Sequence, residues 1–355
     1  EGALKPIADM AREGLERADA RKRGEEEPVP VPWKEYAGII GGGLWPGMHV
    51  LVGGTGAGKT TFAVQIGMAA ASNGCPVAYV GLELDEPQIG LRMVAETGWS
   101  KLYLGKHGPG QRAEAKSRLE RMADWPLYGV MGDPSGWPAS KLEGIAASLR
   151  AEAERRANGT PPKPGLIVLD FLQLVGNEAA DKRTELRERI GRAAYTARQV
   201  ARKHNVAVVL VSSAARDKYT ALAGGCAGAG LVTKRTKDGK PAGVIYRPDE
   251  LVGTGKESGE IEYAADSVTV LVKMPNAYGA PVVLCCVPKL RYGQARWTPM
   301  VFEDQRFRPV DFGLVAKLPP TDDTAEASDV PDTARRCQNP DCGKAFDDVR
   351  MFCPE

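Results

Sequence analysis

The chain has 355 residues, 43% of them hydrophobic and 26% charged, and its formal net charge at pH 7 is +2. A chain of this length can bury one large core with short appendages, and the small net charge excludes the global basic field of a histone-like protein, so any nucleic-acid contact must come from local patches. The longest apolar runs, such as Val206–Val211, have the length of a strand and fall far short of the roughly 20 residues that span a bilayer.

The first segment carries an apolar stripe at spacings of three and four, formed by Leu4, Ile7, Ala11, Leu15 and Ala18. This period predicts a helix, and the Pro-rich residues 25–32 end it and should run extended. Because so short a helix is not stable alone, residues 1–24 should dock on their own domain or on a neighbouring subunit, with residues 25–37 as a tether. The first 23 residues are charged throughout and contain no signal peptide, so we expect a cytoplasmic protein without membrane contact.

From Met48 onward, strands and helices are expected to alternate. The expected strands are His49–Val52, Val77–Leu82, Leu166–Asp170 and Ala207–Ser212. The expected helices are Thr60–Ser72, Pro87–Glu96, Lys141–Ala157 and Thr184–His204, with a surface region before Trp137. Continuous apolar strands that alternate with helices predict an α/β fold with a mainly parallel sheet covered on both faces.

A different pattern follows the polar, glycine-rich stretch Asp217–Gly255. Three apolar runs, Ser267–Val272, Pro281–Val287 and Thr298–Phe302, are separated by short turns and predict an antiparallel edge to the sheet. Residues 38–315 are therefore expected to form one domain, residues 316–335 a flexible linker and residues 336–355 a separate tail.

A phosphate-binding loop is predicted between the first strand and the first helix of this domain, where the sequence fits GxxxxGK[ST]. Its glycines let backbone N–H groups turn toward phosphates, and the helix N-terminus adds its positive end. Lys59 should reach the β- and γ-phosphates of ATP, and the hydroxyl of Thr60 should bind Mg²⁺. The expected nucleotide-binding residues are Gly53, Gly54, Thr55, Gly56, Ala57, Gly58, Lys59, Thr60 and Thr61.

Two carboxylates stand where strands are expected to end. Asp170 closes an apolar strand, which would place it beside the phosphate loop to hold the water shell of Mg²⁺. Glu83 follows the strand after the phosphate-loop helix and could orient and deprotonate the attacking water. From its position alone, Glu83 is equally well interpreted as a solvent-facing glutamate at the end of a strand.

Basic residues gather in two loop segments, which predict phosphate contacts with single-stranded DNA in a central pore. They are Lys182 and Arg183 in the first segment and Arg216, Lys218, Lys234, Arg235, Lys237 and Lys240 in the second. A solvated insertion is the alternative, since no set of aromatic residues accompanies the charges.

The cysteines fall into two groups. Cys75, Cys226, Cys285 and Cys286 are scattered and are expected to be reduced thiols rather than disulfides. Cys337, Cys342 and Cys353 resemble a zinc ribbon cut short, and they would need a fourth ligand to complete a tetrahedral Zn²⁺ site.

Several motifs, in order and at matching spacings over residues 38–312, resemble the C-terminal motor domain of the DnaB-family replicative helicases. They are Gly43–Gly47, Gly81–Leu84 followed by Gln88 and Leu91–Met93, Asp170–Leu174, Glu257–Glu262 followed by Ala265 and Asp266, and Lys289–Gly293. The resemblance implies a RecA-like P-loop NTPase core, with Glu83 as the catalytic base and Arg291 as an arginine finger that, with Lys289 beside it, serves the adjacent subunit. It also implies a hexameric ring in which the N-terminal helix docks on a neighbour.

Two departures from the family pattern stand out. The family carries Ser-Gln where this chain has Ser212-Ser213, and its Gln senses the γ-phosphate; Ser213 would reach a phosphate only through water, or Arg216 would take over part of the task. The family's N-terminal helical domain is also absent from this sequence, which favours a relative from a phage, plasmid or mobile element, or an excised fragment.

The leading hypothesis is an ATP-driven DNA helicase or translocase that acts with replication proteins. Two alternatives stay open. One is a RecA-like, DNA-stimulated ATPase that acts in recombination or defence without unwinding, and the other is a regulatory or scaffolding ATPase.

Overall fold

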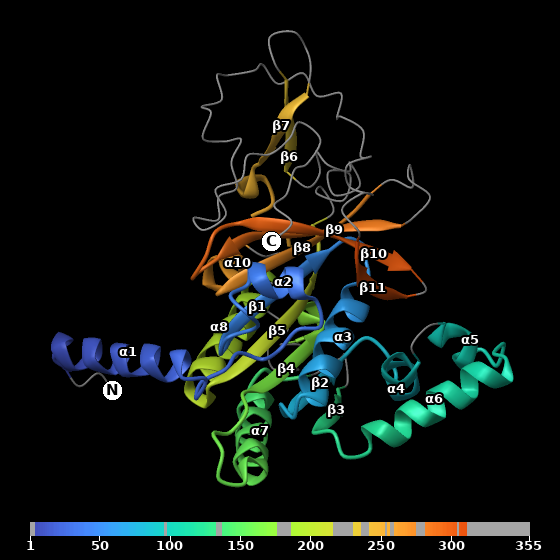
Figure 1. Cartoon of the computed structure of the whole chain (residues 1–355), viewed down its shortest axis with the longest axis horizontal. Helices are drawn as coiled ribbons and strands as arrows, with labels where there is room; N and C mark the ends of the chain where they lie inside the picture. The colour runs from blue at the N-terminus through green and yellow to red at the C-terminus, as the bar shows by residue number, and fades with distance from the viewer. Residues whose placement is uncertain are drawn as a thin grey trace.

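The computed structural model describes residues 4–95, 98–132, 137–175, 186–215, 230–235, 241–252, 254–255, 259–274, 281–303 and 305–310. Over these residues, one sheet of nine strands runs in the order β11-β10-β9-β8-β1-β5-β4-β2-β3, and helices cover both of its faces (Figure 1). No helix in this part of the chain is both long and apolar enough to cross a membrane.

One part of the sheet, which reaches from β8 to the edge strand β3, is parallel. Its strands are β1 (Gly47–Gly53), β2 (Val77–Gly81), β3 (Leu127–Met131), β4 (Gly165–Asp170), β5 (Val206–Ser213) and β8 (Ser267–Lys273). Every residue of β1, β2 and β4 is buried, because helices cover both faces and the strands are mostly apolar. The predicted parallel core is confirmed.

One end of the sheet is antiparallel, as the sequence predicts. β8 pairs with β9 (Val282–Leu290), β9 with β10 (Arg296–Glu303) and β10 with β11 (Arg306–Pro309). The four-residue β11 was not expected, since so short a run carries no clear apolar period.

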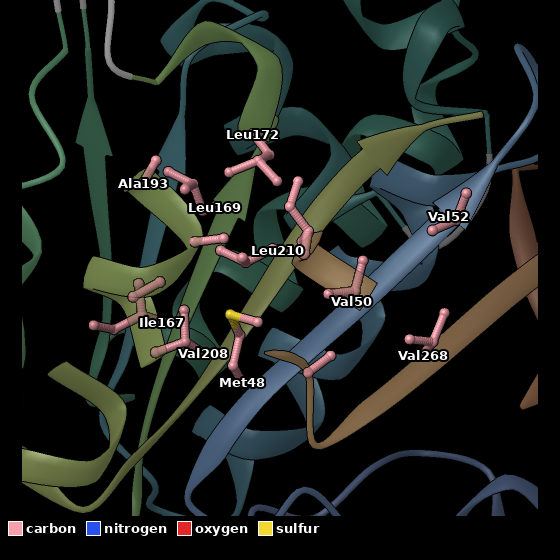
Figure 2. Packing of buried hydrophobic residues seen from close by; sticks show 14 of the residues in the cluster. Met48, Val50, Val52, Ile167, Leu169, Leu172, Ala193, Val208, Leu210 and Val268 are labelled. Carbon is pink, nitrogen blue, oxygen red and sulfur yellow. The ribbon is translucent and has the colours of Figure 1, made fainter. Parts of the chain in front are cut away.

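Alternate residues of the buried strands face opposite sides of the sheet, and each side has its own hydrophobic core. On one side, strand residues such as Leu51 pack against α2 (Lys34–Ile39), α3 (Lys59–Ser72) and α4 (Glu86–Val94). On the other side, Val50 and its equivalents pack against α7 (Lys141–Ala157), α8 (Leu186–His204) and α10 (Gly259–Ala264). Figure 2 shows part of this second core, including Met48, Val50, Val52, Ile167, Leu169, Val208 and Leu210. Each fully buried aliphatic side chain contributes about 1.5–3 kcal/mol of transfer free energy.

The region before Trp137 lies mostly at the surface, as expected, but it contains secondary structure that the sequence did not predict. It forms α5 (Trp99–Tyr103), α6 (Pro109–Met122) and the strand β3. β3 pairs with β2 alone at the edge of the sheet, and its middle residues are exposed. Gly129 interrupts the short apolar run of this half-exposed strand, which explains why it was missed.

The N-terminal helix α1 spans Ile7–Lys22 and buries none of its residues. It begins and ends later than the predicted Leu4–Ala18, and Figure 1 shows it projecting from the rest of the chain. Its contacts with the domain are polar: Arg17 Nη2 donates to Asn205 Oδ1 at 2.7 Å, and the guanidinium of Arg21 lies 4.3 Å from the ring centroid of Trp45. The apolar stripe is therefore left exposed, with Ile7 at 76% and Leu15 at 69%.

A long insertion follows β5 at the carboxyl edge of the parallel strands. Ala214 pairs with Gly255 in an isolated antiparallel bridge, so the insertion leaves and returns at the same place. Between these points, β6 (Leu231–Arg235) and β7 (Pro241–Tyr246) form an antiparallel hairpin in a segment that was expected to be a flexible loop. A 3-10 turn, η5 (Pro248–Glu250), follows the hairpin. Three of the scattered cysteines, Cys75, Cys285 and Cys286, are buried as expected.

Candidate functional site

The phosphate loop connects the end of β1 to the start of α3, in the strand–turn–helix order that phosphate binding requires. Gly56 and Gly58 have φ values of 74° and 87°, which glycine adopts without steric cost. A Cβ on Gly58 would lie 2.7 Å from Cζ of Phe307, so this position also needs glycine for space. Lys59 Nζ donates a hydrogen bond to the carbonyl oxygen of Gly54 at 3.0 Å, which holds the lysine over its own loop.

Aromatic side chains pack around the start of α3, next to the phosphate loop. The ring of Phe62, in the first turn of α3, stacks on Trp33 with centroids 4.3 Å apart and meets Phe307 edge-on at 5.3 Å. Gln65 fixes the backbone of Phe307 on both sides, accepting from its N–H at 2.8 Å and donating to its carbonyl oxygen at 3.1 Å. These contacts tie the antiparallel edge strand β11 to the start of α3 and make the loop part of a rigid frame.

The carboxylate of Asp170 lies at the end of β4, where it is 3% exposed. Its Oδ2 accepts a hydrogen bond from the hydroxyl of Tyr79 at 2.6 Å. Burial, followed by the negative charge of Asp170, raises the pKa of Tyr79 well above its ordinary value, so the phenol stays protonated and remains a donor. Sequence reasoning missed Tyr79, because an aromatic residue in an apolar strand is usually read as core.

Lys59, Asp170 and Glu83 come together at the carboxyl edge of the sheet. Glu83 follows β2, whose last residue Gly81 is paired with Asp170, and the Glu83 side chain is exposed. Burial lowers the pKa of Lys59, while the nearby charges of Asp170 and Glu83 oppose this shift. A phosphate chain held by Lys59 would therefore lie beside one buried and one solvent-accessible carboxylate.

Arg92 on α4 adds a cation to the same region. Its guanidinium lies 3.7 Å from the ring centroid of Trp99, and its buried Nη1 has no hydrogen-bond partner within the described residues. Burial lowers the pKa of Arg92, and the negative charges of Asp170 and Glu83 oppose this shift. The sequence offered only the Leu91–Met93 resemblance as a signal for this residue.

The end of β5 lies between the phosphate loop and Asp170, and it carries Ser212 and Ser213. Ser213 is paired with Gly53, the first residue of the phosphate loop. The side chain of Gln173 spans both serines: its Nε2 donates to Ser212 Oγ at 2.8 Å and its Oε1 accepts from the Ser213 N–H at 3.5 Å. A glutamine side chain thus lies at this strand end, although it comes from the turn η1 (Leu172–Leu174) after β4.

The chain matches the family model described as "DnaB-like helicase C terminal domain" over residues 37–220, just over half of its length. The chain belongs to this family. It is a helicase-type ATPase domain, as the phosphate loop and its carboxylates also indicate. No curated protein sequence matches the chain.

Two solved structures support the same fold. The first, a structure described as an ATPase domain, has a TM-score of 0.63 and 17% identity, over 88% of this chain and 100% of that chain. The second, "The Structure Of A DnaB-Like Replicative Helicase And Its Interactions With Primase", has a TM-score of 0.62 and 17% identity, over 88% of this chain and 68% of that chain. At this identity the likeness bears on the fold alone, and it confirms the expected RecA-like core.

ATP and Mg²⁺, which DnaB-like ATPases use, fit the residues at the carboxyl edge. Thr60 and Asp170 offer the hydroxyl and carboxylate oxygens that Mg²⁺ prefers, and Asp170 lies close enough to Lys59 to affect its pKa. Zinc has no such support: Cys337, Cys342 and Cys353 lie outside the described residues, and the described part contains no group of three or more ligands that could hold a metal.

Arg291 and Lys289 lie at the opposite edge of the sheet from the phosphate loop of their own chain. Arg291 Nε forms an ion pair with Asp266 Oδ1 at 2.7 Å, and Asp266 Oδ2 accepts from the backbone N–H of Met48, at the start of β1. The phosphate loop begins where β1 ends, five residues later, which is about 16 Å along a strand. The predicted finger therefore does not reach the nucleotide site of its own chain.

Of the residues predicted to contact DNA, only Lys234 and Arg235 lie in the part of the chain that the structure describes. Lys182, Arg183, Arg216, Lys218, Lys237 and Lys240 lie outside the described residues. Lys234 and Arg235 belong to β6, where the ladder has an irregularity between them.

Proposed function

We propose that this domain is a ring-forming motor that hydrolyses ATP at subunit interfaces to move along single-stranded DNA and unwind duplex DNA. One observation carries the proposal. The nucleotide-binding residues lie at the carboxyl edge of the parallel strands, whereas Arg291 lies at the amino edge. A contact between the carboxyl edge of one subunit and the amino edge of the next is head-to-tail, and such contacts form a ring when the rotation between subunits closes.

In this arrangement, each chain supplies most of its own hydrolytic site. Lys59 and the phosphate-loop N–H groups bind the phosphates, and Thr60 and Asp170 would hold Mg²⁺, which would neutralise charge on the phosphate oxygens. Glu83 accepts a proton from a water molecule, whose oxygen attacks the γ-phosphorus as the bond to the bridging oxygen of ADP breaks. Arg291 of the adjacent subunit stabilises the charge that develops on the transferred phosphoryl group.

The exposed helix α1 supports ring assembly. Leu4 is fully exposed and Ile7 and Leu15 remain mostly exposed, although an amphipathic helix of this kind gains its stability by packing its apolar face. The short polar contacts at its C-terminal end leave the stripe available. We propose that the stripe docks on a neighbouring subunit and that the complete ring is a hexamer.

The insertion after β5 supports a link between DNA and hydrolysis. The Ala214 N–H donates to the carbonyl oxygen of Gly53 at 3.2 Å, and the Ala215 N–H donates to the carbonyl oxygen of Thr254 at 2.8 Å. The start of a lysine- and arginine-rich segment is therefore bonded to the first residue of the phosphate loop, and the end of the segment is bonded to its start. We propose that this segment and Lys182–Arg183 contact DNA phosphates, so that strain on the DNA reaches the nucleotide site.

We assign the motor to DNA replication, together with other replication proteins. A DNA-stimulated ATPase that does not unwind is the second candidate, favoured by the serine at position 213. The Gln173 contact with Ser212 and Ser213 supports the motor, since it brings an amide to the strand end where the family carries its phosphate-sensing glutamine.

The direct test measures the ATPase rate with and without single-stranded DNA, on protein whose mass in solution is determined in the same buffer. A ring-sized species that DNA stimulates, and that displaces a labelled strand from a forked duplex, is the expected result. A ring that DNA stimulates but that displaces no strand would favour the second candidate. A monomer whose hydrolysis is indifferent to DNA would contradict both.

A further inference from the structure

The corner between α10 and β8 holds both cations at the end of β9. Lys289 Nζ donates to the carbonyl oxygen of Glu262 at 2.7 Å, and Arg291 Nε pairs with Asp266 Oδ1 at 2.7 Å. The Arg291 backbone N–H also donates to the carbonyl oxygen of Asp266 at 2.8 Å. Arg291 is therefore fixed at two points by the same residue, once through its main chain and once through its side chain.

Asp266 is itself anchored to the start of β1. Its Oδ2 accepts from the Met48 N–H at 2.9 Å, and its own N–H donates to the carbonyl oxygen of Met48 at 2.7 Å. A Cβ on Gly47 would lie 2.6 Å from Oδ2, so Gly47 leaves the space that this carboxylate fills. The side chain of Asp266 is 12% exposed and that of Arg291 is 33% exposed, which places the acid inside the fold and the guanidinium at its surface.

The two partners of Asp266 explain why position 266 carries an aspartate. Both the Met48 N–H and Arg291 Nε are donors, and they bind different oxygens of one side chain. A carboxylate offers two acceptor oxygens, whereas an asparagine offers one oxygen and a donor NH₂ group. The guanidinium group is planar and rigid. When Arg291 is bound at Nε, its two terminal amino groups can therefore bind a second anion.

We propose that Asp266 is a positioning residue for the arginine finger: it orients Arg291 so that its terminal amino groups face the nucleotide bound by the adjacent subunit. This inference rests on the proposed sharing of the active site. The ion pair also removes part of the freedom of a long side chain before the subunits meet, so less rotamer entropy is lost when the finger engages phosphate.

The test measures steady-state ATP hydrolysis by Asp266→Asn protein, with Glu35→Gln as the matched control. Glu35 is an exposed acid in α2, so its substitution also removes one negative charge and should leave the rate unchanged. Asp266→Asn should lower kcat by roughly 10- to 100-fold, the range for losing a hydrogen bond to a charged group. The KM for ATP and the mass of the ring should stay as in the unaltered protein, because the phosphate loop is untouched.

Mixed assemblies separate a positioning role from a general structural defect. Asp266→Asn subunits keep Lys59, Asp170 and Glu83, so they should regain activity when mixed with Glu83→Ala subunits, which supply a correctly held finger. They should not regain activity with Arg291→Ala subunits, because both partners then lack a working finger. If Asp266→Asn does not fold, Gly47→Ala offers the same test, since its methyl group would crowd Oδ2 while both charges remain.

The outcomes distinguish this inference from the proposed function. The reference mixture of Arg291→Ala with Glu83→Ala must recover activity, and no recovery there contradicts the shared site itself. If the reference mixture recovers, Asp266→Asn protein with unaltered kcat overturns the positioning role alone. Recovery of Asp266→Asn with Arg291→Ala, or no recovery with Glu83→Ala, overturns it as well.

Discussion

In the proposed motor, the two edges of the parallel sheet carry complementary halves of a phosphoryl-transfer site. At the carboxyl edge, Lys59 lies near the carboxylates of Asp170 and Glu83, which we propose hold Mg²⁺ and accept a proton. At the amino edge, Arg291 and Lys289 are each held by the corner between α10 and β8. Among the described residues, the first edge has a loop shaped for phosphates without the finger, whereas the second has a fixed finger without a phosphate loop. Because each edge lacks what the other carries, the proposed chemistry requires contact between two subunits.

The largest expected effect lies at the carboxyl edge. Lys59→Ala should abolish ATP hydrolysis, because no other side chain of the loop supplies a positive charge to the β- and γ-phosphates. A phosphate-release assay checks this. Lys163→Ala is the control, since Lys163 forms an exposed ion pair with Glu27 and should keep the full rate. Persistent turnover by Lys59→Ala protein would show that the phosphate loop is not the site.

At the amino edge, Arg291→Ala should lower kcat by about 10³-fold, as for other arginine fingers. Nucleotide binding should be unaffected, because the residue lies far from the phosphate loop of its own chain. Titration with a fluorescent ATP analogue measures binding, and steady-state kinetics measure turnover. Arg296→Ala is the matched control, an exposed arginine at the start of β10 on the same edge, and it should stay within about twofold of the unaltered rate. Equal losses in the two variants would contradict a specific finger.

A smaller effect is expected beneath the nucleotide site. Tyr79→Phe leaves the buried Asp170 Oδ2 without its donor and should lower the free energy of unfolding by about 1–3 kcal/mol. It should also raise the Mg²⁺ concentration needed for half-maximal hydrolysis, because Asp170 loses its fixed orientation. Tyr128→Phe is the control, because it removes a hydroxyl that donates to Glu152 on an exposed face. Its free energy of unfolding should stay within about 0.5 kcal/mol of that of the unaltered protein. Urea unfolding and Mg²⁺ titrations compare the two, and identical behaviour would contradict the role of Tyr79.

The smallest effect concerns pH. Burial lowers the pKa of Lys59 below its ordinary value of 10.5, so the lysine loses its charge at a lower pH than an exposed lysine. Since the charged form binds phosphate, ATP affinity should weaken as the pH rises through this lowered pKa. Arg291→Ala protein should show the same alkaline loss, because Arg291 does not contact the nucleotide of its own chain. Affinity that stays constant up to the ordinary pKa of lysine would contradict the shift.

The sequence predicts the parallel core well because its strands are continuous apolar runs between amphipathic helices; the helix Lys141–Ala157 has the bounds that were expected. The sequence-based prediction fails at β3, which is half exposed, and at β11, which is short. Neither strand shows the regular pattern of apolar residues that marks a buried strand. Among the site residues, the phosphate loop follows from local sequence, since its geometry is made within one short run of neighbouring positions. The contacts of Asp170 with Tyr79 and of Asp266 with Met48 join residues 91 and 218 positions apart. Such pairs depend on strand order and register, which no local pattern encodes.

The most direct test of the two-edge account mixes Glu83→Ala and Arg291→Ala proteins, each inactive alone, before ATP hydrolysis is measured. In an equal mixture, about a quarter of head-to-tail interfaces combine an intact carboxyl edge with an intact amino edge. The account predicts that hydrolysis returns in the mixture, with a rate that follows the fraction of such interfaces as the mixing ratio is varied. A mixture no more active than its two components, with mass measurements showing mixed rings, would contradict an active site shared between subunits.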